Sequence, residues 1–257
     1  MIRYSVCAPA LFPRVPLCEA VKSIAPTGAK HYEFWGWQGV DLDELFAVQE
    51  DTGVTATAMC TLFEPLTVPE KRNAYIDGLK LTIAAARKLG IRTLISQVGA
   101  DQPGVSHALQ HASIVDGLKA CAPIVEDSGM TLTIEPLNTL VDHKGYFLES
   151  SKEAFDIVDE VGSENVKVLF DVYHQQITEG NVLSNLLTGL SKIGHIHIAG
   201  NPGRHEPYTC CELNYGYIIN QLKKAGYSGA IGLEYMPTFD PVTSLIGFFN
   251  TMPVLPD

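Results

Sequence analysis

The sequence has few basic residues, and this shortage limits the partners that the protein can have. Lysine and arginine number 18 against 29 aspartates and glutamates, which gives a formal net charge of −11 at pH 7. Proteins that bind the phosphate backbone of nucleic acids normally carry a basic surface. We therefore expect no nucleic-acid partner and rank a nuclease low among the candidate functions.

Long apolar runs and disulfide motifs are also missing. No apolar stretch approaches the roughly 20 residues of a membrane span, and the first six residues lack the basic and apolar regions of a signal peptide. The six cysteines form no CxxC pair, so we interpret the adjacent Cys210 and Cys211 as reduced loop thiols. We expect a cytoplasmic protein with no membrane partner. The oligomeric state stays open, a homo-oligomer being one option.

A glycine-rich turn after the first predicted strand is absent as well. Open doubly wound sheets bind nucleotides with such a turn, but residues 7–12 read Cys-Ala-Pro-Ala-Leu-Phe. Eight strand-like runs instead alternate with eight helix-like runs, and no linker interrupts them. A closed barrel of this kind needs about 250 residues, close to the 257 residues here. We predict one α/β domain, residues 1–257, folded as a single (β/α)8 TIM barrel.

The predicted elements follow from apolar runs and from the glycines and prolines between them. Glycines 53, 90 and 129 are expected to end three of the helices. The predicted strands cover residues 3–7, 30–35, 54–60, 93–98, 131–135 and 166–171, with a seventh ending near 199 and an eighth at 235. The predicted helices cover 16–23, 41–53, 69–89, 105–128, 151–161, 181–192 and 215–225, with a last short one from 241.

Four predicted strands in the second half each deliver a side chain that can bind a metal. These side chains are Glu135, Asp171, His197 and Glu234, spaced by about one strand–helix–strand repeat. The C-terminal ends of parallel barrel strands meet at one face, where buried like charges without a cation would be costly. Mixed oxygen and nitrogen donors suit Mg²⁺ or Mn²⁺. The sequence therefore predicts a divalent metal site at the barrel mouth.

Further polar side chains are expected close to these four. His195 lies on the same strand face as His197 but one layer deeper, which favours a supporting or core role. His174 follows Asp171 in a predicted loop and is a candidate hydrogen-bonding partner of the substrate. We expect both histidines to belong to the pocket rather than to the surface.

Two segments outside these strands contribute candidate substrate-binding residues. Arg204 lies in a loop rich in proline and glycine, and its planar guanidinium could bind a substrate carboxylate through two hydrogen bonds. Glu33 and Trp35 follow the second predicted strand and are expected at the pocket wall. Ordinary packing between strand and helix is the alternative for these two.

Several motifs resemble those of the hydroxypyruvate isomerase family, which belongs to the xylose-isomerase-like barrels together with the ketose 3-epimerases. The resemblance spans nearly the whole chain. It implies that Glu135, Asp171, His197 and Glu234 are metal positions and that the two glutamates act as acid and base. The motifs are Glu135-Pro-Leu-Asn138, Asp171-Val-Tyr-His-Gln-Gln176, the segment 194–207, Gly232-Leu-Glu-Tyr235 and Glu212-Leu-Asn-Tyr215, the last of which adds Glu212 to the predicted substrate-binding residues.

The hypothesis that combines these observations is a metal-assisted isomerase. Its substrate is a small hydroxy-carbonyl acid, most simply hydroxypyruvate, which becomes tartronate semialdehyde (2-hydroxy-3-oxopropanoate) through a cis-enediolate. Glu135 and Glu234 exchange the protons, and Arg204 holds the carboxylate. The alternatives are a ketose 3-epimerase or other isomerase acting on neutral sugars, a metal-dependent endonuclease, and a non-catalytic carbohydrate-binding barrel.

Overall fold

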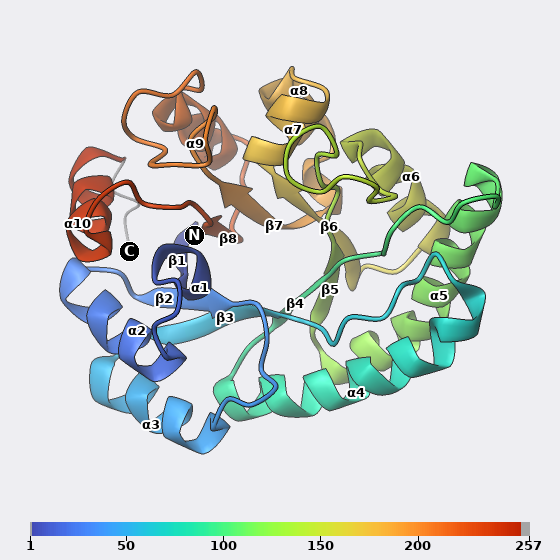
Figure 1. Cartoon of the computed structure of the whole chain (residues 1–257), viewed down its shortest axis with the longest axis horizontal. Helices are drawn as coiled ribbons and strands as arrows, with labels where there is room; N and C mark the ends of the chain where they lie inside the picture. Colours follow the sequence, from blue (N-terminus) through green and yellow to red (C-terminus); the bar gives the residue numbers. More distant parts are fainter. Residues whose placement is uncertain (1, 253–257) are drawn as a thin grey trace.

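The computed structural model describes residues 2–252, and its eight strands close into one parallel barrel in the order β1 to β8. The helices form a ring around this barrel (Figure 1). The predicted (β/α)8 barrel is therefore confirmed. The strands are β1 Arg3–Cys7, β2 His31–Phe34, β3 Thr55–Cys60, β4 Thr93–Ser96, β5 Thr131–Ile134, β6 Val166–Asp171, β7 Ile193–Ile198 and β8 Ala230–Leu233.

The helices follow the strands in chain order and differ from the predicted set after β1, after β6 and within residues 181–192. Short helices follow β1 and β6 where none was predicted, and the predicted helix 181–192 is a helix followed by a 3₁₀ turn, Leu190–Lys192. The helices are α1 Ala8–Leu11, α2 Leu17–Ile24, α3 Leu42–Thr52, α4 Arg72–Leu89, α5 His107–Ser128, α6 Ser151–Val161, α7 Val172–Thr178, α8 Val182–Thr188, α9 Tyr215–Lys224 and α10 Pro241–Thr251; further 3₁₀ turns cover Ala25–Thr27 and Pro69–Lys71.

The ends of the longer helices follow the chemistry expected from the sequence. Gly53, Gly90 and Gly129 end α3, α4 and α5 with φ angles of 68°, 72° and 68°. This left-handed conformation is accessible to glycine without a Cβ clash. At the other ends, Asp41 and Ser106 accept hydrogen bonds from the first backbone N–H groups of α3 and α5. Local residue chemistry thus fixes where these helices begin and end.

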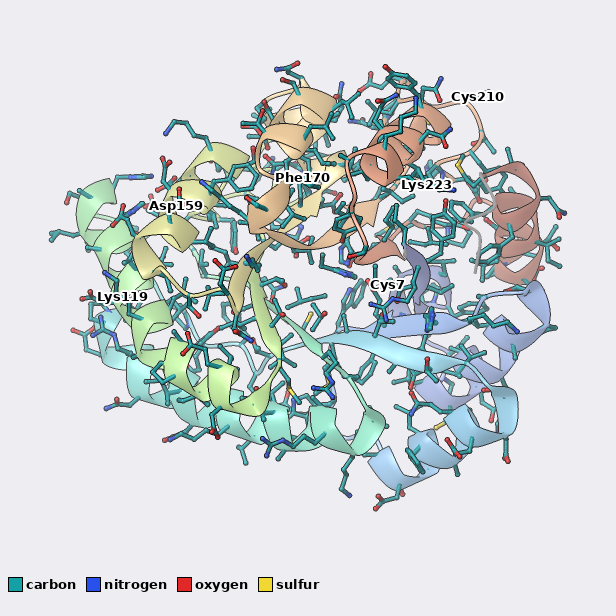
Figure 2. The ribbon with its side chains drawn as sticks, turned by 180° about the vertical axis from the view of Figure 1, so that it is seen from behind. Cys7, Lys119, Asp159, Phe170, Cys210 and Lys223 are labelled. Atoms are coloured by element: carbon teal, nitrogen blue, oxygen red, sulfur yellow. The ribbon has the colours of Figure 1, made fainter. Side chains whose placement is uncertain are left out.

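Apolar side chains occupy two separate regions of the fold. A large cluster fills the layer between the strands and the helices, and a small cluster of Ala58, Cys60, Ile95 and Leu169 lies apart from it. Cys60 and Ile95 of the small cluster also line the cavity at the barrel mouth. Viewed from behind, Cys7 lies near the barrel centre, whereas Lys119 lies on the outer helices (Figure 2). The small cluster therefore borders the cavity.

Helix α7 shows how one side chain shapes the end of a strand. Asp171 closes β6, and its Oδ1 accepts hydrogen bonds from the backbone N–H groups of Tyr173 at 2.8 Å and His174 at 3.4 Å. An aspartate in this position starts a helix because it satisfies otherwise unpaired N–H groups. The prediction that His174 lies in a loop is therefore wrong: it lies in the first turn of α7.

Two further expectations concern membranes and cysteines. Across residues 2–252, none of the helices combines the length and the apolar composition needed to cross a bilayer. All six cysteines lie within this range and are free; Cys210 is exposed and Cys211 is half-buried. The pair lies in a loop, as predicted, and its reduced state stays a prediction.

Candidate active site

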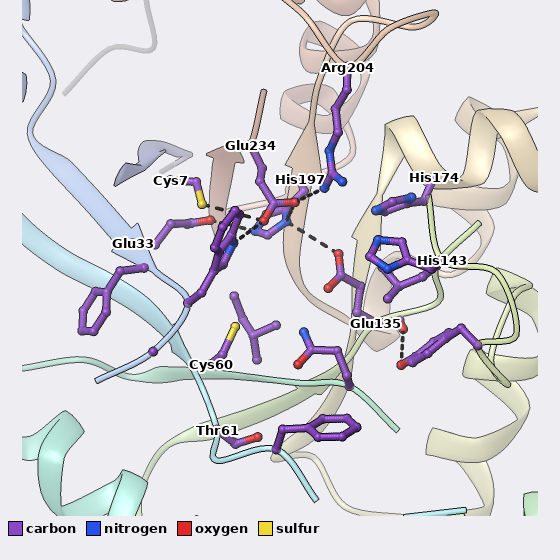
Figure 3. Close-up of a pocket in the computed structure, with 18 of the residues that line it drawn as sticks. Cys7, Glu33, Cys60, Thr61, Glu135, His143, His174, His197, Arg204 and Glu234 are labelled. Carbon is purple, nitrogen blue, oxygen red and sulfur yellow. Dashed lines mark hydrogen bonds and ion pairs between the residues drawn. The ribbon is translucent and has the colours of Figure 1, made fainter. Parts of the chain in front are cut away.

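A cavity of about 620 Å³ opens where the C-terminal ends of the strands meet (Figure 3). Its wall combines aromatic and aliphatic side chains with a few charged ones, an arrangement typical of small-molecule sites. Seven residues predicted for the site line it: Glu33, Trp35, Glu135, His174, His197, Arg204 and Glu234.

Three buried carboxylates form the centre of this site. Glu135 follows β5, Asp171 ends β6 and Glu234 follows β8, and oxygens of all three lie within 4.8 Å of one another and of a nitrogen of His174. Within residues 2–252, Oε1 of Glu135 and Oδ2 of Asp171 have no hydrogen-bond partner although both are buried. Buried oxygens left in this state are costly unless a cation or ligand contacts them. The donor set therefore fits a hard divalent cation.

His197 of β7 contacts two of these three carboxylates. Its Nδ1 lies 3.3 Å from Oε2 of Glu234 and 3.7 Å from Oε1 of Glu135. Its Nε2 lies 2.7 Å from Oε1 of Glu33, whose other oxygen lies 3.0 Å from Nε2 of His195. Glu33 is only 1% exposed. It therefore bridges two imidazoles, and His195 takes the deeper supporting position that the sequence predicts.

The two glutamates that face the cavity differ in their surroundings. Burial raises the pKa of Glu135 to about 8, with His197 opposing this rise and Glu234 adding to it. Burial also acts to raise the pKa of Glu234, but the charges of His197 and Arg204 and several hydrogen bonds outweigh it and hold that pKa well below the usual range. The difference arises because Glu234 has several donors around it and Glu135 has few.

Arg204 reaches from the loop after β7 into the cavity (Figure 3). Its Nη2 lies 2.5 Å from Oε2 of Glu234 and 3.8 Å from Oδ2 of Asp171. The guanidinium also lies over the ring of Tyr173, 5.3 Å from its centroid. The backbone of Arg204 has a φ of 58°, an unusual value for a residue other than glycine. The backbone N–H of Met236 donates to its carbonyl over 2.7 Å and helps to hold this conformation.

One residue predicted to bind substrate lies elsewhere. Glu212 is exposed and does not line the cavity. Its Oε1 accepts a hydrogen bond from Nε2 of Gln176 over 3.1 Å. The structure therefore does not bring Glu212 to the carboxylate group, and its predicted contact with substrate gains no support from the geometry.

Sequence reasoning missed several residues of the cavity. His143 lines it and packs edge-on against His174, with ring centroids 5.1 Å apart. Asn138 approaches His174 from the same loop. Two sequence signals point to this loop: Asn138 closes the motif that begins at Glu135, and residues 138–146 are largely polar and follow β5 without an apolar period. Such a loop is typical of a functional segment but does not reveal which side chain contacts which.

Comparison with known proteins identifies the family. The family model of the xylose isomerase-like TIM barrel matches residues 20–251. The chain belongs to this family. It is 35% identical to hydroxypyruvate isomerase of Escherichia coli strain K12 over 170 residues, which cover 66% of this chain and 65% of that protein. The resemblance predicted from the sequence motifs is therefore confirmed.

Two further similarities extend this comparison. The chain is 45% identical to 2-oxo-tetronate isomerase of Cupriavidus necator over 126 residues, 49% of this chain and 48% of that protein. The crystal structure titled AP endonuclease, family 2, from Brucella melitensis matches at a TM-score of 0.91 with 26% identity, over 98% of this chain and 100% of that one. The chain thus spans about two thirds of the E. coli relative and about half of the C. necator one.

Proposed function

We propose that the protein is an isomerase that interconverts the ketone and aldehyde forms of a small hydroxy-carbonyl acid. The simplest pair is hydroxypyruvate and tartronate semialdehyde. The observation that carries the proposal is that Glu135 and Glu234 face one buried point from β5 and β8, with a guanidinium beside them. The names of the E. coli and C. necator relatives support an isomerase of keto acids.

The residues that would hold a divalent cation are Glu135, Asp171, His197 and Glu234. The unpartnered buried oxygens of Glu135 and Asp171 support this set. When bound, Mg²⁺ or Mn²⁺ would stabilise the negative charge that develops on the substrate oxygens during the reaction. The sequence and the donor chemistry favour these two ions over a thiolate-binding metal.

The chain's own carboxylates would move the protons. One of Glu135 and Glu234 removes a proton from the hydroxymethyl carbon beside the ketone, which gives an enediolate. A carboxyl group then returns a proton to the former carbonyl carbon. The hydroxyl proton passes from the hydroxymethyl oxygen to the former ketone oxygen, so that the first becomes the aldehyde oxygen and the second a hydroxyl. The two glutamates are 4% and 6% exposed, so the reacting carbons would be largely shielded from bulk water.

Arg204 would select for an acid substrate. It is the one lysine or arginine among the described residues that line the cavity, and a guanidinium can bind a carboxylate through two parallel hydrogen bonds. A neutral ketose offers no such group. An endonuclease would need several basic side chains along its nucleic-acid substrate. The cavity wall has a single one, and the net charge of −11 also argues against a nucleic-acid substrate.

We also infer a cytoplasmic location as part of this proposal. All six cysteines are free, and reducing compartments preserve free thiols. Cell fractionation would test it, and recovery of the protein outside the cytoplasmic fraction would contradict it.

A substrate series tests the choice between an acid and a neutral sugar. We expect the Mg²⁺-loaded protein to convert hydroxypyruvate but not D-fructose. The substitution Arg204→Met should lower kcat/KM for hydroxypyruvate by about 10- to 100-fold, because a hydrogen bond to a charged group contributes about 1.5 to 3 kcal/mol. Turnover of D-fructose alone would move the function to a neutral-sugar epimerase. Equal activity of Arg204→Met and the wild type would contradict the proposal that Arg204 binds the substrate carboxylate.

A further inference from the structure

Asn138, in the loop after β5, is completely buried and lies against His174 of α7. Its Nδ2 is 2.6 Å from Nδ1 of His174, although the two residues are 36 positions apart in the chain. Neither the family assignment nor the proposed acid and base gives Asn138 a role. Its surroundings nevertheless determine which nitrogen of His174 carries a proton.

The orientation of the Asn138 amide is fixed on both sides. Its Oδ1 accepts hydrogen bonds from the backbone N–H groups of Val141 at 3.0 Å and Asp142 at 3.1 Å. Its Nδ2 donates to Oδ2 of Asp142 over 2.8 Å, and the same carboxylate oxygen accepts from the hydroxyl of Tyr173 at 3.0 Å. The flipped amide would place its oxygen against a carboxylate and its NH₂ group against two N–H donors. Only the observed orientation satisfies every donor and acceptor.

A fixed amide leaves one arrangement for the imidazole. Because Nδ2 of Asn138 is a donor, Nδ1 of His174 must accept, and so it cannot carry a proton. The doubly protonated imidazolium is excluded for the same reason, since two donors would then meet at 2.6 Å. In a neutral imidazole the proton therefore resides on Nε2.

The Nε2–H group of His174 is directed toward the site. It lies 3.4 Å from Oδ2 of Asp171, and among residues 2–252 it has no hydrogen-bond partner although it is buried. His174 lines the cavity. An N–H in this position can donate to a substrate oxygen but has no lone pair to offer a cation, although His174 lies within 4.8 Å of the three carboxylates.

We propose that Asn138 is a positioning residue that holds His174 as the Nε2–H tautomer. His174 is then a hydrogen-bond donor to an oxygen of the substrate and is not a metal ligand. The assignment of the substrate contact rests on the proposed isomerase function, whereas the tautomer does not. The two parts can therefore be tested separately.

The first test is long-range ¹H–¹⁵N NMR of the metal-free protein labelled with [¹⁵N]histidine, with the His174 signals assigned from their absence in His174→Gln. We expect a protonated Nε2 and an unprotonated Nδ1. His205 provides an internal reference of the opposite kind, because its Nδ1 lies 2.9 Å from the carbonyl oxygen of Met236 and must carry the proton. A protonated Nδ1 on His174 would overturn the proposal.

The second test uses variants of residue 138. Asn138→Asp replaces the donor by an acceptor, and His174 should then carry its proton on Nδ1. Asn138→Ala leaves Nδ1 unpartnered, and kcat with hydroxypyruvate should fall about 10- to 100-fold in both variants. The matched control is Thr139→Ala, because the Thr139 hydroxyl donates its hydrogen bond to the exposed Glu149 side chain, away from His174, and its loss should leave kcat unchanged.

The outcomes separate the two claims. A wild-type protein with the expected tautomer but no turnover of hydroxypyruvate would contradict the proposed function and leave the role of Asn138 in setting the tautomer standing. Unchanged tautomer and unchanged kcat in Asn138→Asp would overturn the positioning role. Melting temperatures of the variants identify any that fail to fold, and in that event the wild-type NMR spectrum still decides.

Discussion

The indole N–H of Trp35 donates a hydrogen bond to Oε1 of Glu234 over 2.7 Å. The two residues lie far apart in the chain, 199 positions, and meet because β1 pairs both with β2, which precedes Trp35, and with β8, which precedes Glu234. Trp35 remains 45% exposed and lines the cavity. Trp35 therefore forms part of the pocket wall and also orients a carboxylate that we propose to be catalytic.

Replacing Trp35 by phenylalanine should separate these two roles. The ring stays in the wall, but Glu234 loses a donor that is specific to indole. A hydrogen bond to a charged group contributes about 1.5 to 3 kcal/mol, so kcat should fall about 10- to 100-fold. Trp37→Phe is the matched control, because its indole N–H donates to Thr82 instead, over 3.2 Å. Equal kcat values in both variants would contradict a role for Trp35 in orienting Glu234.

Glu33 should support metal binding without contacting the metal. Its carboxylate holds Nε2 of His197 at 2.7 Å, which leaves Nδ1 facing the other carboxylates. Removing such a supporting group typically weakens metal binding about 10- to 100-fold. We expect Glu33→Gln to raise the Kd for Mn²⁺ by this factor, measured by titration calorimetry.

A substitution at Gly232 and a double mutant with His197 test whether Glu33 acts through His197. A Cβ at Gly232 would lie 2.4 Å from Oε1 of Glu33 and 2.5 Å from Cδ2 of His197, so Gly232→Ala should weaken Mn²⁺ binding as well. Gly216→Ala in α9 is the control, since the nearest atom to its Cβ would be 3.6 Å away. The effect of Glu33→Gln should vanish in a His197→Gln background; an equal loss there would show that Glu33 does not act through His197.

His111 on α5 should make stability depend on pH. Its Nδ1 lies 3.0 Å from Oε1 of Glu153, and its Nε2 lies 3.1 Å from Oε1 of Glu160. Burial acts to lower the pKa of His111, but the hydrogen bonds to the two glutamates outweigh it and raise that pKa. The stabilisation is therefore complete below the unfolded-state pKa of about 6.5 and is lost as the pH rises through the higher folded-state pKa.

Melting curves of His111→Gln would measure this effect. The variant should melt about 1 to 3 °C below the wild type at pH 5.5, and the difference should shrink at alkaline pH. His31 is a control of opposite sign, because burial and the nearby Arg3 lower its pKa. The melting temperature of His31→Gln relative to the wild type should rise as the pH falls. A difference for His111→Gln that does not vary with pH would contradict the assignment.

The sequence predicted the features that local residue chemistry controls, namely the strand ends and the helix ends. Glu135, Asp171 and Glu234 each end or follow an apolar strand, and parallel strands must bring such ends together. Glycines 53, 90 and 129 likewise predicted where three helices end. The short helix α7 was missed because Asp171 was read only as the end of a strand, whereas its side chain also caps the helix that follows.

The contacts that the sequence could not predict join distant loops and strands. The hydrogen bond from Trp35 to Glu234 and the contact between Asn138 and His174 depend on how the barrel closes and on how a polar loop folds. Glu33 was predicted to contact substrate because it follows a strand toward the pocket. Its contacts with His195 and His197 join β2 to β7 across the barrel, and a side chain at Gly232 would collide with Glu33 and His197. No local pattern reveals these contacts.

The most direct test of the central claim is proton NMR of hydroxypyruvate in D₂O with the Mg²⁺-loaded protein. The account predicts a tartronate semialdehyde signal and deuterium at carbon with the wild type. It predicts a loss of at least about 100-fold in rate for Glu135→Gln and for Glu234→Gln. Turnover at the wild-type rate in both variants, or deuterium exchange with D-fructose alone, would contradict it.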